Sequence, residues 1–395
     1  MDDPRKSSHI FGFSGLADAF SKRRIRILTI MRKFVCRSIR LVLHKQRPWS
    51  EKLSRRKPKF SAGQWVYLYV PYDNKFLSIC PPVGHPFSIA NAPRPNVSGD
   101  ELAVDDLDKL ELHIGIIGRE HLEFTNSVWE FPAHEPRSWT DKLRERILKG
   151  RLTQAEAEDP LSIEEKTVYV VGPYGTAFES CFKPEFASAV VIGAGTGLTA
   201  AESVLREFVK TKAVSPELLP DLLWFVWSCA SLDDLMWCWE TLVREMTKMI
   251  MYEKRRTGRD FTELTVTGSN QIAWLGVTFY VTRLSKKEEL DTFHAKMIAR
   301  AEQPRDREPP EVRNVRLLVT NFLFNQIQAG ALDDEDRHIR HLLKSVHQKS
   351  SMTAREAASM TVAFCGPSNL ASVVNSAKHE LSKLNINVEF SQDGQ

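Results

Sequence analysis

The chain has 395 residues, of which 42% are hydrophobic and 26% charged, a composition typical of globular proteins and a length sufficient for two domains with separate cores. No apolar run reaches the ~18–20 residues of a membrane-spanning helix, and no apolar segment follows the first charges, so we expect neither a membrane span nor a signal peptide. The net charge of +4 conceals an asymmetry: residues 1–60 carry 17 Lys and Arg against 4 Asp and Glu, or +13, and the remaining residues carry −9.

Several catalytic patterns are missing from the sequence. The six cysteines form no C-x-x-C pair and no metal-ligand spacing, so we expect reduced thiols and no metal site. We find no Ser-His-Asp arrangement, no H-E-x-x-H motif and no Walker-type loop.

Residues 1–37 are predicted to be a basic arm that is partly disordered or lies on a membrane surface. Residues 1–20 lack a periodic pattern, whereas 21–43 place apolar residues such as Ile25 and Phe34 among Arg and Lys. A basic amphipathic pattern suits an anionic surface, most simply a membrane face, and we expect no nucleic-acid partner. A disordered leader is the alternative interpretation.

Residues 38–182 are predicted to form a small antiparallel β-barrel. Short strands separated by turn residues are typical of such a barrel. The β-rich runs are found at 38–44, 64–71, 85–90, 110–118 and 167–173. Residues 144–166 are predicted to be an inserted helical hairpin or loop.

Residues 183–395 are predicted to form a parallel α/β domain. Buried strands alternate with amphipathic helices, beginning with a strand at 187–195 and a helix at 198–211. This alternation favours a parallel sheet, whose ligands bind at the carboxyl ends of the strands. The Pro- and charge-rich stretch 302–313 is predicted to be an exposed loop.

The tryptophans of this second half lie in apolar contexts. We expect them in the core rather than on a surface that stacks bases. They are Trp224, Trp227, Trp237, Trp239 and Trp274.

Gly193, Gly195 and Gly197 lie at the predicted turn from a strand to a helix. Missing side chains let the backbone approach a pyrophosphate, and a helix N-terminus stabilises its negative charge. The strict G-x-G-x-x-G pattern fails because Leu198 occupies the last glycine position. A nucleotide loop and a plain strand-to-helix turn are both compatible with these residues.

Two further turns follow predicted strands. The turn at 172–175, GPYG, can present backbone amides and a ring edge to a ligand, or it can be a tight turn between domains. The turn at 365–367, CGP, places a thiol at the end of a strand. That thiol either faces a ligand or, more commonly for a lone Cys, belongs to a small core residue.

Two stretches of the predicted barrel region are further candidate ligand-binding motifs. The cluster at 85–88, HPFS, is either a ligand-binding strand end or a barrel strand with a core Phe. Trp139-Thr140 opens a helical segment beside Arg137, where the hydroxyl either contacts a phosphate or caps the helix.

In this order and spacing, the motifs resemble the cytosolic dehydrogenase portion of NADPH oxidases and ferric-chelate reductases, within the ferredoxin–NADP reductase superfamily. The resemblance covers about residues 38–395. It rests on the following residues: His85, Pro86, Phe87, Ser88, Ala92, Pro93, Leu112, His113, Ile114, Trp139, Thr140, Gly172, Pro173, Tyr174, Gly175, Gly193, Gly195, Gly197, Thr199, Cys365, Gly366 and Pro367.

The resemblance implies FAD in the barrel and NADPH on the α/β domain, with NADH as the alternative nucleotide. Phe87 is implied to pack on the isoalloxazine ring, Ser88 to hydrogen-bond its N5, and His85 to contact the ribityl or phosphate portion. Ser88 and Cys365 are the implied catalytic residues, Cys365 by facing the nicotinamide. The remaining matched residues are implied to bind the cofactors, Trp139 and Thr140 near the pyrophosphate.

Four positions depart from the family pattern. Gly115 stands where the family has the Arg of H-I-R, and Ala230 stands near an Arg for the NADPH 2′-phosphate, for which Arg283 is the nearest substitute. Ala200 replaces a Pro, and the aromatic C-terminus is missing unless Phe390 takes its role. Three arginines are candidates to replace the one missing at 115: Arg94, Arg119 and Arg137.

We expect hydride transfer from NAD(P)H to FAD and then release of single electrons, to haem and dioxygen in a superoxide-generating oxidase. No stretch here resembles the haem-binding membrane helices of the family, so a haem-containing transmembrane segment or subunit is an expected partner. The alternatives are a soluble flavin or ferric-chelate reductase and a degenerate nucleotide-binding module without turnover. We expect a location at the cytoplasmic face of a membrane, with the cytosol as the alternative.

Overall fold

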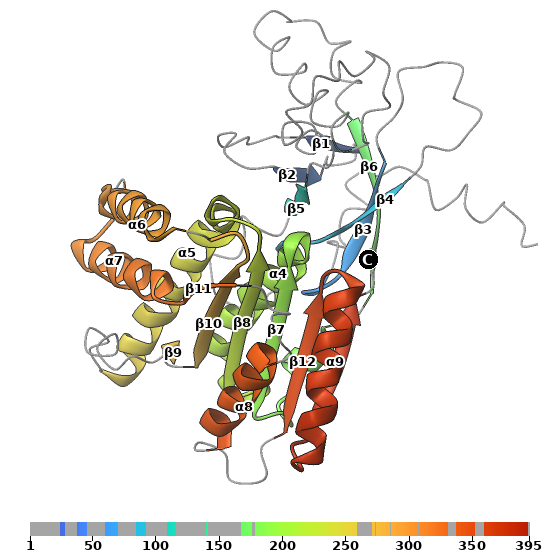
Figure 1. Cartoon of the computed structure of the whole chain (residues 1–395). Coiled ribbons are helices and arrows are strands. Elements are labelled where there is room, and N and C mark those ends of the chain that lie inside the picture. Colours follow the sequence, from blue (N-terminus) through green and yellow to red (C-terminus); the bar gives the residue numbers. More distant parts are fainter. Residues whose placement is uncertain are drawn as a thin grey trace, which may run out of the picture.

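Two sheets lie side by side in the structure (Figure 1). The antiparallel sheet comes first in the sequence, and the mainly parallel sheet follows. The computed structural model describes residues 24–27, 38–45, 60–69, 84–91, 109–115, 140, 167–175, 178–258, 271–272, 274–284, 286–305, 308–330, 337–351 and 359–393.

The antiparallel sheet has six strands in the order β4-β3-β6-β1-β2-β5. A bridge between Ile89 and Leu112 links the segment after β4 to β5, so the two edges of the sheet meet at one point. The strands are β1 (Arg24–Ile27), β2 (Ser38–Lys45), β3 (Trp65–Tyr69), β4 (His85–Ser88), β5 (Lys109–Gly115) and β6 (Thr167–Tyr174).

Alternation along the strands explains which side of this sheet is buried. Val66 and Leu68 on β3 are buried, as are Leu112 and Ile114 on β5. A period of two is what a strand with one apolar face requires. The predicted antiparallel architecture is therefore confirmed, although the described strands form no closed barrel, and the bounds 38–182 stay a prediction.

Strand β1 differs from the sequence-based expectation. Residues 24–27 lie in the range predicted to be a basic arm, yet they pair with β2 and β6 in the antiparallel sheet. The RIRI sequence alternates apolar and basic residues, a period-two pattern that fits a strand as well as an amphipathic surface segment. The remainder of residues 1–37 lies outside the described residues.

The second sheet has the order β11-β10-β8-β7-β12-β13 and is parallel throughout this path, while β9 pairs antiparallel with β10. Strands β7, β8, β10 and β12 are buried along their whole length, as parallel strands covered on both faces are. The strands are β7 (Ser188–Ala194), β8 (Leu222–Cys229), β9 (Gln271–Ile272), β10 (Leu275–Val281), β11 (Ile327–Ala329), β12 (Met360–Cys365) and β13 (Val388–Asp393).

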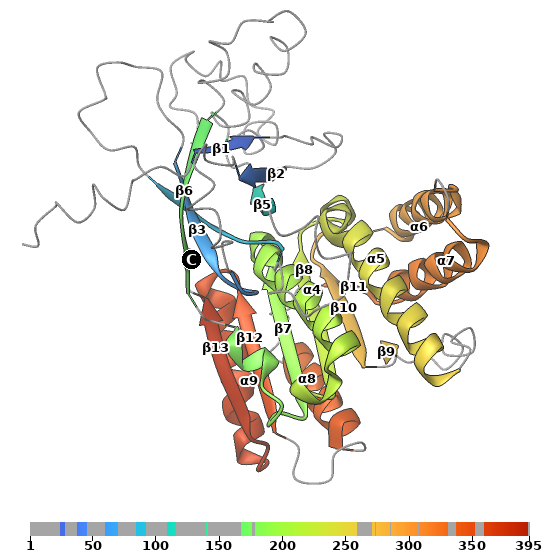
Figure 2. The same cartoon turned by 180° about the vertical axis from the view of Figure 1, so that it is seen from behind.

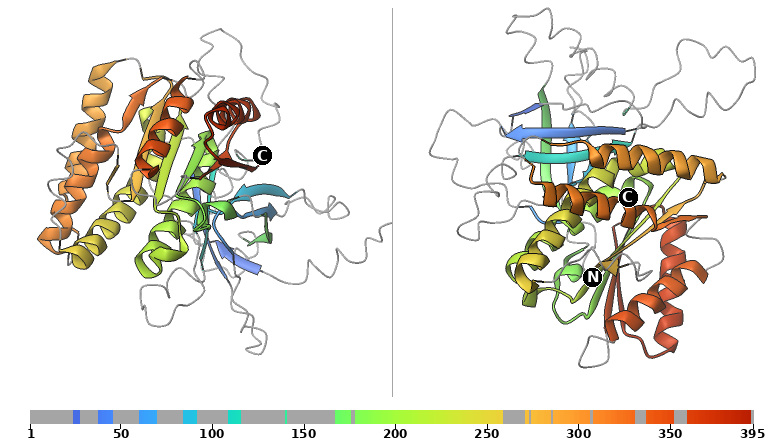
Figure 3. Two further views of the ribbon diagram at one scale, coloured as in Figure 1. Left: turned by 90° about the horizontal axis from the view of Figure 1, so that it is seen from below. Right: turned by 90° about the vertical axis from the view of Figure 1, so that its left-hand side faces the viewer.

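Helices cover both faces of the parallel sheet. One core cluster joins α4, α5, α6 and α7 to the sheet, and another joins α8 and α9 to its opposite face. Figures 1 and 2 show these two faces in turn, and Figure 3 shows the layers from below. The helices are α4 (Leu198–Val214), α5 (Leu232–Thr257), α6 (Lys287–Glu302), α7 (Pro310–Phe324), α8 (Arg337–Ser351) and α9 (Ser368–Lys383).

The exposed loop predicted at 302–313 is shorter than expected. Helix α6 ends at Glu302 and α7 begins at Pro310. Proline is well tolerated at the first helical position, where its missing N–H has no intrahelical partner to lose. The same proline that indicated a loop therefore begins a helix.

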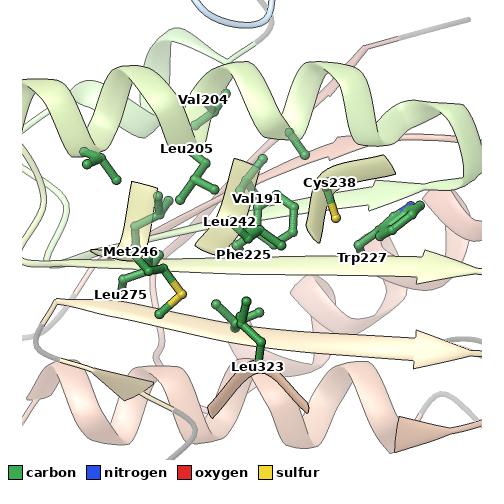
Figure 4. Packing of buried hydrophobic residues seen from close by; sticks show 14 of the residues in the cluster. Val191, Val204, Leu205, Phe225, Trp227, Cys238, Leu242, Met246, Leu275 and Leu323 are labelled. Atoms are coloured by element: carbon green, nitrogen blue, oxygen red, sulfur yellow. The ribbon is translucent and has the colours of Figure 1, made fainter. Parts of the chain in front are cut away.

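The first core cluster packs α4 and α5 against the sheet, as Figure 4 shows for Leu205, Leu242 and Phe225. Four of the five tryptophans predicted to be core are buried, and the fifth, Trp237, is partly buried against the same cluster.

Phe390 lies on β13, pairs in register with Val362 and packs on the second cluster. It is therefore held in the sheet.

Among the described residues, none of the helices combines the length and the apolar character that crossing a membrane demands.

Candidate functional site

The site lies where the connections of the parallel sheet reverse direction. From β7 the chain proceeds to β8, β10 and β11 on one side, and then returns to β12 on the other side of β7. Ligands of open α/β sheets bind outside the carboxyl ends of the strands at such a point. The glycine loop (residues 193–197) follows β7, and the 365–367 turn follows β12, so the topology brings these two motifs together.

Close packing explains why the glycine loop and the 365–367 turn need glycine. A Cβ on Gly197 would overlap the carbonyl group of Cys365, and a Cβ on Gly366 would come to 2.7 Å from the Cβ of Ala194. Gly193 is similarly restricted, because its Cβ would lie 3.0 Å from the backbone nitrogen of Leu198. The two motifs are therefore in direct backbone contact.

Gly195 is the open part of the glycine loop. It has a φ of +55°, and a Cβ built on it would meet nothing within 4 Å. Trp227 Nε1 donates to its carbonyl oxygen at 3.2 Å, which holds the loop in place. Helix α4 starts directly after the 3-10 turn Gly195–Gly197 without a side-chain cap, and the Leu198 N–H already donates to the carbonyl oxygens of Gly195 and Thr196. The N–H groups at the start of that turn, which have no intrahelical acceptor, are the ones that can meet an anion.

Thr199 and Cys365 are buried beneath the glycine loop. Thr199 is 3% exposed in the first turn of α4, and Cys365 is fully buried in the first core cluster. The Cys365 side chain is therefore buried in this structure, as the second of the two interpretations expects. Its implied role facing the nicotinamide stays a prediction.

The HPFS cluster and the 172–175 turn meet through Trp65 on β3. Trp65 pairs with Ser88 of β4 on one side and with Tyr174 of β6 on the other. Ser88 is buried, and Pro86 is the exposed member of the cluster. Burial lowers the pKa of His85 below its ordinary value, so this imidazole favours its neutral form.

Three aromatic rings form a patch that the motif analysis missed. Trp65 lies 4.9 Å from Tyr174 and 5.0 Å from Tyr67 between ring centroids, and Tyr174 is 39% exposed. Gln64 Nε2 donates to the carbonyl oxygen of Gly175 at 3.1 Å, which ties β3 to the 172–175 turn. The alternation W-x-Y at 65–67 was the available signal, because alternate residues of a strand share a face.

His113 and Ile114 on β5 have different environments. Ile114 is fully buried within the antiparallel sheet, whereas His113 lies against α4 between Glu111 and Glu202. The His113 Nε2 is hydrogen-bonded to Glu111 at 3.1 Å, whereas Nδ1 lies 3.3 Å from Glu202 Oε2 without a hydrogen bond. Motif reasoning missed these two glutamates and their partner Arg206.

The other predicted site residues are placed as follows. Arg283 is exposed just after β10, and Thr140 is partly buried. Pro173 is partly buried in the strand end of β6, and Pro367 follows β12. Ala92, Trp139 and the three arginines proposed to replace the one missing at 115 lie outside the described residues.

Searches against known proteins support the resemblance to the oxidases. No protein-family model matches the chain. Human NADPH oxidase 5 is 28% identical over 268 residues, covering 61% of this chain and 32% of that protein. Rat dual oxidase 2 is 24% identical over 243 residues, covering 61% and 12%. A heavy chain of the superoxide-generating NADPH oxidase of Dictyostelium discoideum is 26% identical over 187 residues, covering 45% and 21%.

The resemblance to the NADPH oxidases is confirmed. The chain spans about a third or less of the length of these oxidase relatives. Among solved structures, a ferredoxin NADP+ reductase from Neisseria gonorrhoeae with bound FAD and NADP aligns over 93% of this chain and 97% of that one, with 12% identity and a TM-score of 0.45.

Proposed function

We propose that the chain is the FAD-dependent, NADPH-oxidising module of an NADPH oxidase-like system. The observation that carries the proposal is the contact between the glycine loop and the 365–367 turn at the switch point of the parallel sheet. Names of the relatives support the same activity, since they are NADPH oxidases and dual oxidases. Residues 38–182 would then be the FAD-binding domain, and 183–395 the NADPH-binding domain.

The residues at the switch point fit a dinucleotide. Gly195 leaves open space above the loop, and the 3-10 turn Gly195–Gly197 that leads into α4 would offer its first backbone N–H groups to phosphates. Arg283 is exposed at the same edge of the sheet and would contact the 2′-phosphate. These residues bind and orient the nucleotide, and no side chain there has to exchange a proton with it.

The antiparallel sheet would hold the flavin. Exposed Tyr174 and the neighbouring Trp65 offer ring surface beside the strand that carries Ser88. Ser88 would donate a hydrogen bond to the flavin, and His85, in its favoured neutral form, would contact the ribityl or phosphate portion. Bound FAD supplies the ability to accept a hydride and release electrons singly, which no side chain provides.

The electron acceptor would be haem on a transmembrane segment or subunit and, beyond it, dioxygen, giving superoxide. This step rests on the names of the relatives and on the resemblance stated above. It places the chain at the cytoplasmic face of a membrane, with the basic residues of the range 1–37 that lie outside β1 against anionic lipid. Pelleting with vesicles of neutral and of anionic lipid tests that location, and equal pelleting with both would contradict it.

Anaerobic flavin reduction tests the proposed function. The purified chain is loaded with FAD and mixed with NADPH or NADH, and the absorbance of oxidised flavin near ~450 nm is followed. Fast bleaching with NADPH is the expected result. Bound FAD without bleaching, or no bound FAD, would instead favour a degenerate binding module, with Gly115 the first residue to examine. Fast reduction of ferric citrate without a membrane partner would favour a soluble ferric-chelate reductase.

A further inference from the structure

A buried ion cluster joins the antiparallel sheet to helix α4. Arg206 Nη1 donates to Glu111 Oε2 at 2.9 Å, and its Nη2 donates to Glu202 and, at 3.2 Å, to Thr241 Oγ1. Glu111 belongs to β5, whereas Glu202 and Arg206 belong to α4. All three side chains are less than 10% exposed. One guanidinium therefore bridges a carboxylate from each half of the molecule.

His113 makes a second link between the same elements. Its Nε2 lies 3.1 Å from Glu111 Oε1, and its Nδ1 lies 3.3 Å from Glu202 Oε2. The imidazole thus hydrogen-bonds Glu111 through Nε2 and lies beside Glu202, the two carboxylates that Arg206 binds, although Nδ1 and Glu202 Oε2 form no hydrogen bond. Burial alone would lower the pKa of Arg206, but Glu202 and Glu111 raise it above its ordinary value, so the guanidinium keeps its charge in the cluster.

The glycine loop makes the third contact with β5. A Cβ on Gly115 would come to 2.7 Å from Thr196 Cγ2, so the end of β5 lies directly against the loop. A side chain at position 115 would have to displace the Thr196 methyl group. The missing side chain at this position allows the close approach.

These contacts follow one another along β5. Positions 111, 113 and 115 alternate along the strand and meet Arg206, Glu202 and, in the turn before α4, Thr196, so β5 and α4 run in opposite directions. Two residues of a strand span about 6.8 Å, close to the roughly 5.4 Å of the one helical turn from Arg206 to Glu202. A slip of one residue would turn the charged side chains of β5 to the other face of the sheet.

The turn before β3 is held by the same helix. Ser203 Oγ accepts a hydrogen bond from the Gly63 N–H at 2.9 Å, and Glu207 Oε2 accepts one from the Ala62 N–H at 2.8 Å. Helix α4 thus holds both β5 and the strand that carries Trp65. These two backbone amides report directly on whether the sheet is docked.

We propose that Arg206 and Glu202 are positioning residues, which set the distance between the glycine loop and the antiparallel sheet by binding Glu111 and His113. The proposal rests on the proposed function, because that distance decides how the nicotinamide would approach the flavin. Buried ion networks cost desolvation energy, and fixing a register is their best-attested use. A displacement of about 1 Å can cost a hydride donor and acceptor about 100-fold in rate.

The test compares Arg206→Met with Lys212→Met. Lys212 is a matched control because it is also a buried cation on α4, but it donates to the carbonyl oxygens of Pro216 and Pro220 within its own domain. Two readouts are followed: hydrogen–deuterium exchange of the Ala62 and Gly63 amides, and the rate of anaerobic flavin reduction at saturating NADPH.

We expect Arg206→Met to speed the exchange of both amides and to lower the limiting rate about 10- to 100-fold. The affinities for FAD and NADPH should stay unchanged, because Arg206 belongs to none of the motifs that are proposed to bind the two cofactors. Lys212→Met should change neither readout. Equal behaviour of the two variants in both readouts would overturn the proposal.

Glu111→Gln provides a second route if Arg206→Met does not fold, since it weakens the cluster from β5 and leaves α4 intact. It should speed the same exchange and lower the limiting rate, and an unchanged rate would overturn the positioning role. Arg206→Lys should recover the rate only in part, because one ammonium cannot reproduce the two-armed guanidinium contact. If the wild-type chain shows no NADPH-dependent reduction, the proposed function fails together with the positioning role, whereas the exchange data still decide whether Arg206 docks the sheet.

Discussion

The backbone N–H of Arg283 donates to the carbonyl oxygen of Ala230 at 2.9 Å. The residue that follows β10 therefore lies beside the residue that follows β8, at the carboxyl edge of the parallel sheet. Ala230 stands near the position where the family has an Arg for the 2′-phosphate. The structure thus places Arg283 at the end of the neighbouring strand, directly beside Ala230.

Arg283→Ala is expected to weaken NADPH selectively. Removing a charge-assisted contact to the 2′-phosphate costs ~1.5–3 kcal/mol, which corresponds to an increase of at least about 10-fold in the NADPH concentration for half-maximal flavin reduction. NADH lacks this phosphate, so its value should stay the same. Arg305→Ala, which removes an exposed arginine between α6 and α7, is the control. An equal loss for both nucleotides would show that Arg283 does not read the 2′-phosphate.

Gly195→Val should abolish NADPH-dependent reduction while leaving FAD binding intact. The valine side chain fills the open space above the loop that a pyrophosphate would occupy, and the positive φ adds strain. Gly258→Val is a close match, because Gly258 also has a positive φ, +69°, and nothing within 4 Å of a built Cβ, but it ends α5. Stopped-flow flavin reduction and melting curves of both variants separate the loss of NADPH binding from a loss of stability. Equal turnover after equal destabilisation would remove the glycine loop from the site.

Local sequence patterns were sufficient for much of this architecture. The fully apolar strands around Val191 and Phe225 and the glycines after β7 predict a parallel sheet with a nucleotide-type turn, because both signals lie within a few residues of each other. The alternation at Val66 and Leu68 similarly predicts an antiparallel strand. Such patterns can be read from the sequence because the spacing of apolar residues follows the periodicity of the strand or helix that they form.

Contacts between distant segments were beyond the reach of the same reasoning. Glu111 and Arg206 are 95 residues apart, and each looks like an ordinary polar residue of its own element. Nothing local separates a buried thiol at Cys365 from one that faces a ligand, since burial depends on helices contributed by other parts of the chain. Strand β1 was missed because an alternating basic and apolar run fits more than one structure.

Ser88→Ala is expected to slow flavin reduction with little change in fold. Loss of the hydroxyl removes a hydrogen bond to the flavin and costs roughly 1 kcal/mol of stability at this buried position. The limiting rate should fall by about 10-fold or more while the NADPH affinity is unchanged. Ser188→Ala is the control, because Ser188 is a buried serine of β7 whose hydroxyl has no hydrogen-bond partner within the described part of the chain. Rates that are the same in wild type and Ser88→Ala would exclude a role for this hydroxyl in the reaction.

The four described cysteines should resist alkylation in the native chain, including at alkaline pH. All four are buried, and burial raises the pKa of Cys181 to about 12 and the pKa of Cys229 and Cys238 above the ordinary range. At a pH of about 9 an exposed thiol with a pKa of ~8.5 is mostly thiolate and reacts, whereas Cys181, Cys229 and Cys238 remain protonated. Because the folded-state pKa values are raised, the stability that these thiols contribute is complete below the ordinary thiol pKa and is lost as the pH rises towards 12. Peptide mass spectrometry after iodoacetamide treatment, with and without denaturant, measures each site. Fast native labelling of Cys365 in particular would contradict its burial in the core and favour its implied role facing the nicotinamide.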